Sequence, residues 1–184
     1  MSSRFGAIAF TPAVKRLQER DGSRASYARG ESEAAPADPL GAADAAFIAG
    51  RDSFYMATVS ENGWPYVQHR GGPPGFLKVL GPNQLGFADF GGNRQLISTG
   101  NLAVSDRVAL FLMDYPNQRR LKVLGRARVT DAAAVEQRAA RLRDAGAPVG
   151  DARRLAGGVE VAAGGQVHHR VRPPLHRPHR QRAA

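Results

Sequence analysis

Two tight turns flanked by short apolar segments constrain the fold of this chain most. Asn62-Gly63 is the dipeptide that most strongly favours a two-residue hairpin, and Gly81-Pro82-Asn83 has the composition of a second turn. The segments around these turns are short and rich in apolar residues, as strands are. Strands are expected over residues 53–60, 65–70, 76–80, 84–90, 108–113 and 120–130.

The order of these segments favours a small six-stranded antiparallel barrel with helices at its ends. Hairpins join most of the strands, and one helix is expected after the fourth. Strict alternation of strand and helix is absent, and no G-x-G-x-x-G motif follows a strand. The expected fold class is therefore mainly β with flanking helices, and a parallel nucleotide-binding sheet is not expected.

Three parts of the chain differ in pattern. Residues 1–52 contain two helix-start signals, Thr11-Pro12 and Asp38-Pro39, and are expected to form a helical segment that packs on the barrel. Residues 53–150 contain the strands of the barrel domain. Residues 151–184 are basic and rich in Gly, Ala, Pro, His and Arg, and are expected to be a disordered tail.

The end of the barrel domain and the tail each contain one weaker signal. Asp131 is expected to cap a last helix over Ala132–Ala145, whose inner face would carry Val135 and Leu142. In the tail, only Val159–Ala162 could form a short strand.

The formal net charge of +10 is concentrated near the end of the chain. The last twenty residues contain five arginines and no acidic residue, so the charge does not indicate a specific nucleic-acid-binding fold. The chain contains no cysteine, which excludes disulfides and thiolate metal sites. No apolar run approaches the roughly 20 residues of a membrane span, so we expect a cytoplasmic protein without a membrane partner.

A phosphate site is predicted where the second hairpin ends. Gly91-Gly92 allows a sharp change of direction, and Asn93 is a favourable N-cap for a helix expected to end near Gly100. Arg94 and Gln95 would then lie in its first turn, where free N–H groups and the helix dipole favour an anion. Lys78 would supply a second cation. The alternative is an ordinary capped surface helix with a solvated arginine.

Other catalytic chemistries have little support in the sequence. His69 is the only histidine before the tail, so no Ser/His/Asp triad is indicated. The remaining histidines lie in the aperiodic tail, and no metal site is expected. If the protein is an enzyme, an organic cofactor is expected to carry the chemistry.

Motifs along most of the chain resemble those of one known family. They are Ala9–Val14, Phe54–Val59, Pro65–Gly72, Phe76–Lys78, Gly86–Phe90, Gly92–Gln95, Asn101–Leu102, Asp106–Leu112 and Arg120–Ala127. In this order they resemble the pyridoxamine 5′-phosphate oxidase-like flavin-binding split-barrel proteins, in the branch of predicted flavin-nucleotide-binding proteins. The resemblance extends from about Ile8 to Gly150.

The resemblance implies a six-stranded split barrel and a homodimer that holds FMN in clefts between the subunits. FAD or a deazaflavin takes the place of FMN in some branches. The implied function is a flavin-dependent oxidoreductase with unknown substrate and unknown catalytic residues. Two alternatives stay open: a non-catalytic flavin-binding or sensing protein, and a haem-binding split barrel with His69 as axial ligand.

The resemblance also implies where the cofactor binds. Arg94 and its neighbours stand where the family contacts the phosphate, and Lys78 matches the lysine of a Leu-Leu-Lys strand. Two strand edges would flank the isoalloxazine ring. The implied cofactor-binding residues are Gln68, His69, Arg70, Gly71, Lys78, Phe87, Ala88, Asp89, Asn93, Arg94 and Gln95.

The sequence departs from the family pattern in two places, one that bears on substrate specificity and one at the end of the chain. Asn93 and Gln95 replace a typical Ser and Lys, so specificity for pyridoxamine phosphate is not transferred. A closing strand with a Trp-Asn-Cys-Pro-like segment would be expected after the last helix, but the only Trp is Trp64. We therefore hypothesise that the segment after about Arg154 is not the family's native ending, as a shifted reading frame would produce. A lineage-specific disordered tail is the alternative.

Overall fold

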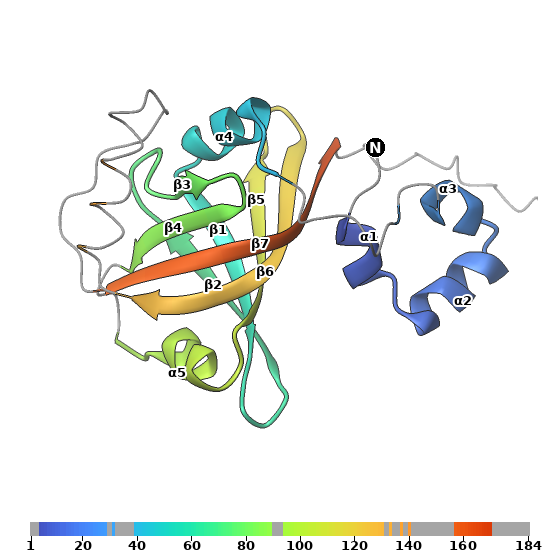
Figure 1. Ribbon diagram of the computed structural model, residues 1–184, viewed down its shortest axis with the longest axis horizontal. Helices are drawn as coiled ribbons and strands as arrows, with labels where there is room; N and C mark the ends of the chain where they lie inside the picture. Colours follow the sequence, from blue (N-terminus) through green and yellow to red (C-terminus); the bar gives the residue numbers. More distant parts are fainter. Residues whose placement is uncertain are drawn as a thin grey trace, which may run out of the picture.

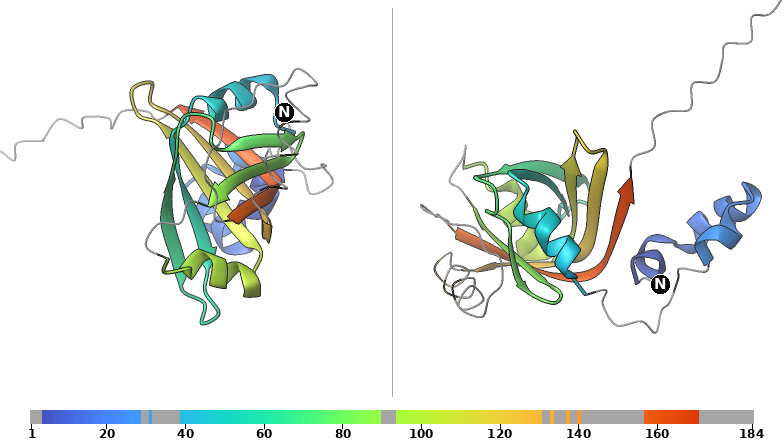
Figure 2. Two further views of the ribbon diagram at one scale, coloured as in Figure 1. Left: turned by 90° about the vertical axis from the view of Figure 1, so that its left-hand side faces the viewer. Right: turned by 90° about the horizontal axis from the view of Figure 1, so that it is seen from above.

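Seven strands form one antiparallel sheet in the computed structural model, in the order β2-β1-β5-β6-β7-β4-β3. The structure describes residues 4–28, 31, 39–89, 94–130, 133, 137, 140 and 157–170, with backbone only at 157–158 and 164–170. The strands are β1 Ser53–Val59, β2 Pro65–Gly71, β3 Lys78–Gly81, β4 Gln84–Asp89, β5 Arg107–Asp114, β6 Arg119–Thr130 and β7 Gly157–Arg170. The sheet curls into a barrel, with β2 and β3 as its two edges (Figure 1, Figure 2). The expected fold class is confirmed, with one strand more than the six expected.

The additional strand is β7, which lies where a disordered tail was expected. It pairs with β6 along one side and with β4 along the other, so it joins the two halves of the sheet. Val159, Val161 and Ala163 are 3%, 1% and 3% exposed, and they alternate with Glu160 and with Ala162, which is exposed. The expectation of a disordered tail is therefore wrong for 157–170. A closing strand is present there, which removes the reason for proposing a shifted reading frame after about Arg154.

β7 approaches β6 closely at one point. A Cβ atom added at Gly125 would lie 2.6 Å from the backbone oxygen of Ala162 and 3.0 Å from Cγ1 of Val161. The strand register also shifts between Leu124 and Gly125. Only glycine leaves room for this contact, so Gly125 is the position at which β6 accommodates the closing strand.

Five helices of the described residues flank the barrel. They are α1 Arg4–Ala9, α2 Pro12–Arg20, α3 Arg24–Ala28, α4 Ala42–Ala49 and α5 Ile97–Val104. α1 lies beside β7, and α2 and α3 extend away from the barrel, while α4 and α5 lie at opposite ends of it (Figure 1). No helix in this part of the chain is long and apolar enough to cross a membrane. The helix expected over 132–145 lies largely outside the described residues.

The helix-start signals were only partly correct. Thr11 caps α2 as expected, since its Oγ1 accepts from the Val14 N–H at 3.5 Å. α4 begins at Ala42, with Gly41 as N-cap, and not at Pro39. The Asp44 carboxylate accepts from the Gly41 N–H at 2.8 Å, so an acidic residue inside the helix sets its start.

Aromatic and branched side chains fill the barrel. The Phe54 ring stacks on Phe76 at 5.5 Å between centroids and meets Phe87 edge-on at 5.1 Å. Met56, Leu85, Leu110, Leu112, Leu121 and Val123 complete the fully buried centre. The strand at 53–59 thus turns Phe54 and Met56 inward and leaves its other face outside.

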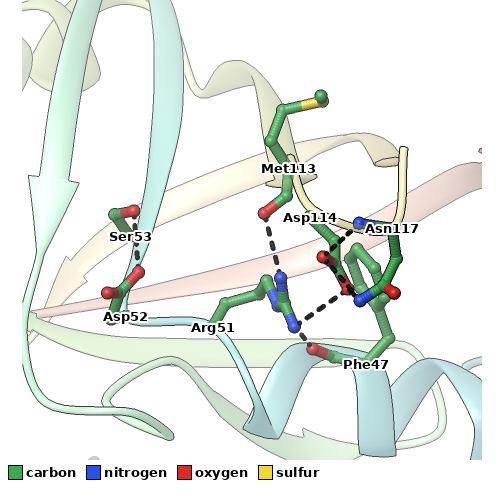
Figure 3. Close-up of polar contacts among 7 residues, drawn as sticks. All are labelled: Phe47, Arg51, Asp52, Ser53, Met113, Asp114 and Asn117. Carbon is green, nitrogen blue, oxygen red and sulfur yellow. Dashed lines mark hydrogen bonds and ion pairs between the residues drawn. The ribbon is translucent and has the colours of Figure 1, made fainter. Parts of the chain in front are cut away.

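Arg51 ties α4 to the turn between β5 and β6 (Figure 3). Its guanidinium donates to the Phe47 carbonyl at 3.3 Å and to the Met113 carbonyl at 3.2 Å, and lies 3.3 Å from a carboxylate oxygen of Asp114. Asn117 donates to the same carboxylate from its amide at 3.0 and 3.1 Å and from its backbone at 3.2 Å. These hydrogen bonds hold the pKa of Asp114 below its usual range, chiefly through the Asn117 amide.

Candidate functional site at the split of the barrel

An ion pair spans the gap between the edge strand β2 and the strand β4. The guanidinium of Arg70, near the end of β2, contacts the carboxylate of Asp89 at the end of β4. The Arg70 side chain is 12% exposed and that of Asp89 24%. β2 and β4 are not hydrogen-bonded neighbours, because the sheet is open between its edge strands β2 and β3. The ion pair therefore connects the two sides of this opening, which we call the split.

Arg70 retains unused hydrogen-bonding capacity. Its Nε is buried and has no hydrogen-bond acceptor among the residues that the structure describes. Its guanidinium carbon lies 5.8 Å from the centroid of the Phe87 ring, within the range of a cation–π contact. A buried donor without an acceptor is costly in an isolated protein. The position therefore favours a ligand that brings an acceptor.

Helix α5 fixes a second polar side chain on the same face of β2. Ser98 Oγ donates to Gln68 Oε1 at 2.7 Å, and Asn101 Nδ2 donates to Thr58 Oγ1 at 2.9 Å. Ser98 and Asn101 are three residues apart, so they lie on one helix face and are both buried against the barrel. This pair was not predicted, because the helix was expected to end near Gly100 and Asn101 was named only within a family motif, whereas α5 continues to Val104.

The predicted residues of β2 do not all lie on one face. Gln68 and Arg70 are partly buried, whereas His69 is exposed on the opposite face, 5.6 Å from the Tyr55 ring centroid. Gly71 ends the strand, and a Cβ there would lie 3.0 Å from the His69 ring. The structure thus brings Arg70 to Asp89 of β4 and Gln68 to Ser98 of α5, and it leaves His69 on the outer surface.

The other predicted residues lie on β3, on β4 and in the segment before α5. Phe87 and Ala88 are buried on β4, and Lys78 on β3 is only 2% exposed, opposite Gly86 in the register. Arg94 and Gln95 are exposed and outside any helix. Asn93 lies outside the described residues.

The expected start of the helix at Asn93 is wrong. α5 begins at Ile97, with Leu96 as N-cap and without a side-chain cap hydrogen bond, and ends at Val104. Arg94 and Leu96 have φ values of +57° and +56°, a left-handed conformation that interrupts a right-handed helix. Arg94 therefore precedes the first turn of α5 and does not lie within it. Its predicted contact with a phosphate stays a prediction.

Hollows lined by described residues also lie away from this ion pair. One, of about 410 Å³, lies between the β1–β2 turn and α5 and is lined by Ser60, Glu61, Asn62 and Asn101. The other, of about 220 Å³, lies over β4, β6 and β7 and contains the Arg126–Asp106 and Arg128–Glu160 ion pairs. Neither is lined by a predicted cofactor residue. Among the described residues, no group of three or more His, Cys, Asp or Glu could hold a metal ion.

Solved structures share this fold at low sequence identity. A single-residue variant of HupZ from Group A Streptococcus aligns with a TM-score of 0.51 and 11% identity, covering 71% of this chain and 99% of that one. A candidate pyridoxamine 5′-phosphate oxidase from Lactobacillus delbrueckii gives a TM-score of 0.49 and 22% identity, with 71% and 94% covered. A Clostridium acetobutylicum protein of the pyridoxinephosphate oxidase family, related to general stress protein 26, gives 0.46 and 16%, with 68% and 84% covered.

The sequence comparison gives the family directly. No curated protein matches the chain. The family profile described as pyridoxamine 5′-phosphate oxidase matches residues 40–164, which include every strand up to the buried part of β7. The chain belongs to the pyridoxamine 5′-phosphate oxidase family.

Proposed function

We propose that the protein binds FMN beside the Arg70–Asp89 pair and acts as a flavin-dependent oxidoreductase on a substrate yet to be found. The observation that carries the proposal is the nearly enclosed Arg70 guanidinium, which lies over Phe87 and has a buried Nε without an acceptor in the described part of the chain. An isoalloxazine ring offers both an aromatic face and carbonyl and ring-nitrogen acceptors, so these residues fit it.

The surrounding residues have separate roles in this proposal. Arg70 would donate to the ring, and Gln68, oriented by Ser98, would contact it from the same side of β2. Arg94 would hold the phosphate through its guanidinium, next to the N-terminus of α5. Bound FMN supplies the hydride chemistry, and the chain supplies binding and orientation.

The same proposal includes a homodimer. The outward residues of β1, β2 and β5 form an apolar surface, which we call the outer face: Tyr55, Ala57, Val67, Ala109 and Phe111, aligned by the strand register. Tyr55 and Val67 are 39% and 60% exposed. A second copy of the chain would cover this face, because a sheet with two apolar faces is stable only when both are covered.

The test of the proposal is FMN binding by wild type and Arg94→Ala, measured by quenching of flavin fluorescence. Loss of a charge-assisted contact should weaken binding by about tenfold to a hundredfold. Arg20→Ala, an exposed arginine at the end of α2, is the matched control and should bind as wild type does. Equal dissociation constants for wild type and Arg94→Ala would refute the role of Arg94, and no FMN binding by wild type would refute the function.

Turnover separates an enzyme from a flavin carrier. Oxidation of a reduced nicotinamide cofactor by the FMN-loaded protein, at a rate above that of free FMN, supports an oxidoreductase. A rate equal to that of free FMN supports the non-catalytic alternative. The absorption spectrum of the purified protein tests the haem alternative at His69.

A further inference from the structure

The charge of Arg70 is already balanced within the protein. Asp89 provides a full negative charge in direct contact with the guanidinium, and both side chains are largely withdrawn from solvent. The attraction between such charges is stronger than at an exposed surface because less water screens them. A ligand that reaches Arg70 therefore meets a neutral pair.

We propose that Asp89 reserves Arg70 for a neutral acceptor on the ligand, and so excludes phosphate from this end of the site. The inference rests on the proposed flavin function and adds the orientation of the ligand and the residue that determines it. Asp89 thus acts as a specificity residue, because it decides which part of the ligand Arg70 can bind.

The hydrogen-bond inventory of Arg70 supports this reading. One terminal nitrogen is occupied by Asp89, while the buried Nε has no acceptor among the described residues. A neutral carbonyl or ring nitrogen can accept from Nε without disturbing the carboxylate. A phosphate dianion at the same place would lie close to Asp89, and like charges in a partly buried site repel strongly.

The alternative is a purely structural role, in which the Arg70–Asp89 ion pair only holds the two sides of the barrel together. In that case Asp89 would stabilise the fold but would not discriminate between ligands. FMN and riboflavin separate the two readings, because they share the isoalloxazine ring and differ by the phosphate. The ratio of their affinities isolates the phosphate contribution from every effect that acts on the ring or on the fold.

The key variant is Asp89→Asn in the full chain, with dissociation constants for both flavins measured by fluorescence quenching and calorimetry. Removal of the carboxylate charge leaves Arg70 uncompensated, so the preference for FMN over riboflavin should rise about tenfold. The control is Asp106→Asn, which breaks the exposed Arg126–Asp106 pair at 2.7 Å and should leave the ratio unchanged. A ratio that stays the same in Asp89→Asn, or falls, overturns the inference.

A double variant guards against misfolding. Arg70→Gln combined with Asp89→Asn removes both charges, so it leaves no uncompensated ion in the protein. If Asp89→Asn alone does not fold, the ratio of FMN to riboflavin affinity in this double variant tests the inference. The double variant should weaken the binding of both flavins by the same factor, about tenfold to a hundredfold for one hydrogen bond from a charged donor, with the wild-type ratio kept. A selective loss of FMN affinity of tenfold or more would show that Arg70 binds the phosphate, and would overturn the inference while leaving the flavin function intact. Absence of binding of either flavin to wild type refutes the proposed function, and the inference with it.

Discussion

The placement of β7 between β6 and β4 makes a sharp prediction about Gly125. Substitution by alanine should destabilise the protein, although the same change in an unconstrained strand stabilises it slightly by restricting the unfolded chain. The reason is the contact with β7: the new Cβ would lie 2.6 Å from the Ala162 carbonyl oxygen, a backbone atom that cannot rotate away. The strands must therefore separate locally.

The change in the free energy of unfolding that Gly125→Ala should cause follows from two opposing effects. Restricting the unfolded chain contributes about 0.5–1 kcal/mol in favour of the folded state. Forcing an extra carbon into a packed strand contact costs about 1–3 kcal/mol and more when the obstacle is backbone. The free energy of unfolding should therefore fall by about 1–2 kcal/mol, which corresponds to roughly 0.5–1 M in the urea midpoint for a slope near 2 kcal/mol per molar.

The assay is equilibrium urea unfolding followed by circular dichroism, with Gly100→Ala as the matched control. Gly100 lies in α5, and a Cβ there would meet no atom within 4 Å. Because alanine favours helix, Gly100→Ala should stabilise the protein by up to about 1 kcal/mol. Opposite signs for the two substitutions are expected. If Gly125→Ala is as stable as wild type, β7 does not lie against β6 as described, and the closing strand must be sought elsewhere.

Two further predictions concern the contacts of Asp114 with Arg51 and Asn117, and the outer face. The hydrogen bonds from Asn117 and Arg51 lower the pKa of Asp114, so its ionised form stabilises the fold at neutral pH. The stability advantage of wild type over Asp114→Asn should therefore shrink as the pH falls through the folded-state pKa of Asp114. An advantage that does not shrink as the solution is acidified would contradict this. Light scattering should give wild type twice the chain mass of 19.7 kDa and Val67→Glu the single mass. Val104→Glu, at an equally exposed position in α5, is the control, and a monomeric wild type would refute the dimer.

β7 was not predicted at its full length because its conformation depends on pairing with strands that are distant in the sequence. Val159, Val161 and Ala163 alternate correctly, but glycine pairs flank them at 157–158 and 164–165, so the segment has little intrinsic strand preference. β4 and the longer strand β6 offer it hydrogen bonds on its two sides, and this pairing over a long sequence separation decides its conformation. By contrast, the two hairpins depend on adjacent residues, so the Asn62-Gly63 and Gly81-Pro82-Asn83 turns were predictable.

The start of α5 failed for a different reason. Asn93 is a favourable N-cap by composition, yet the helix begins only at Ile97, after two residues in a left-handed conformation. Non-glycine residues adopt this conformation at a cost that the rest of the fold must offset. Here Ser98 and Asn101 are buried with hydrogen bonds to β2 and β1, so contacts with the barrel position the helix.

The alternation of β2 limits which predicted residues can serve one ligand. Gln68 and Arg70 share the face that meets α5 and β4, whereas His69 lies on the outer face beside Tyr55. A ligand held by Arg70 in one chain therefore cannot also be held by His69 of that chain, because the strand backbone lies between them. If a second copy covers the outer face, His69 belongs to the interface between subunits. The β2 residues that the resemblance implies for one cofactor site thus divide, by strand geometry alone, between the face that meets α5 and β4 and the outer face.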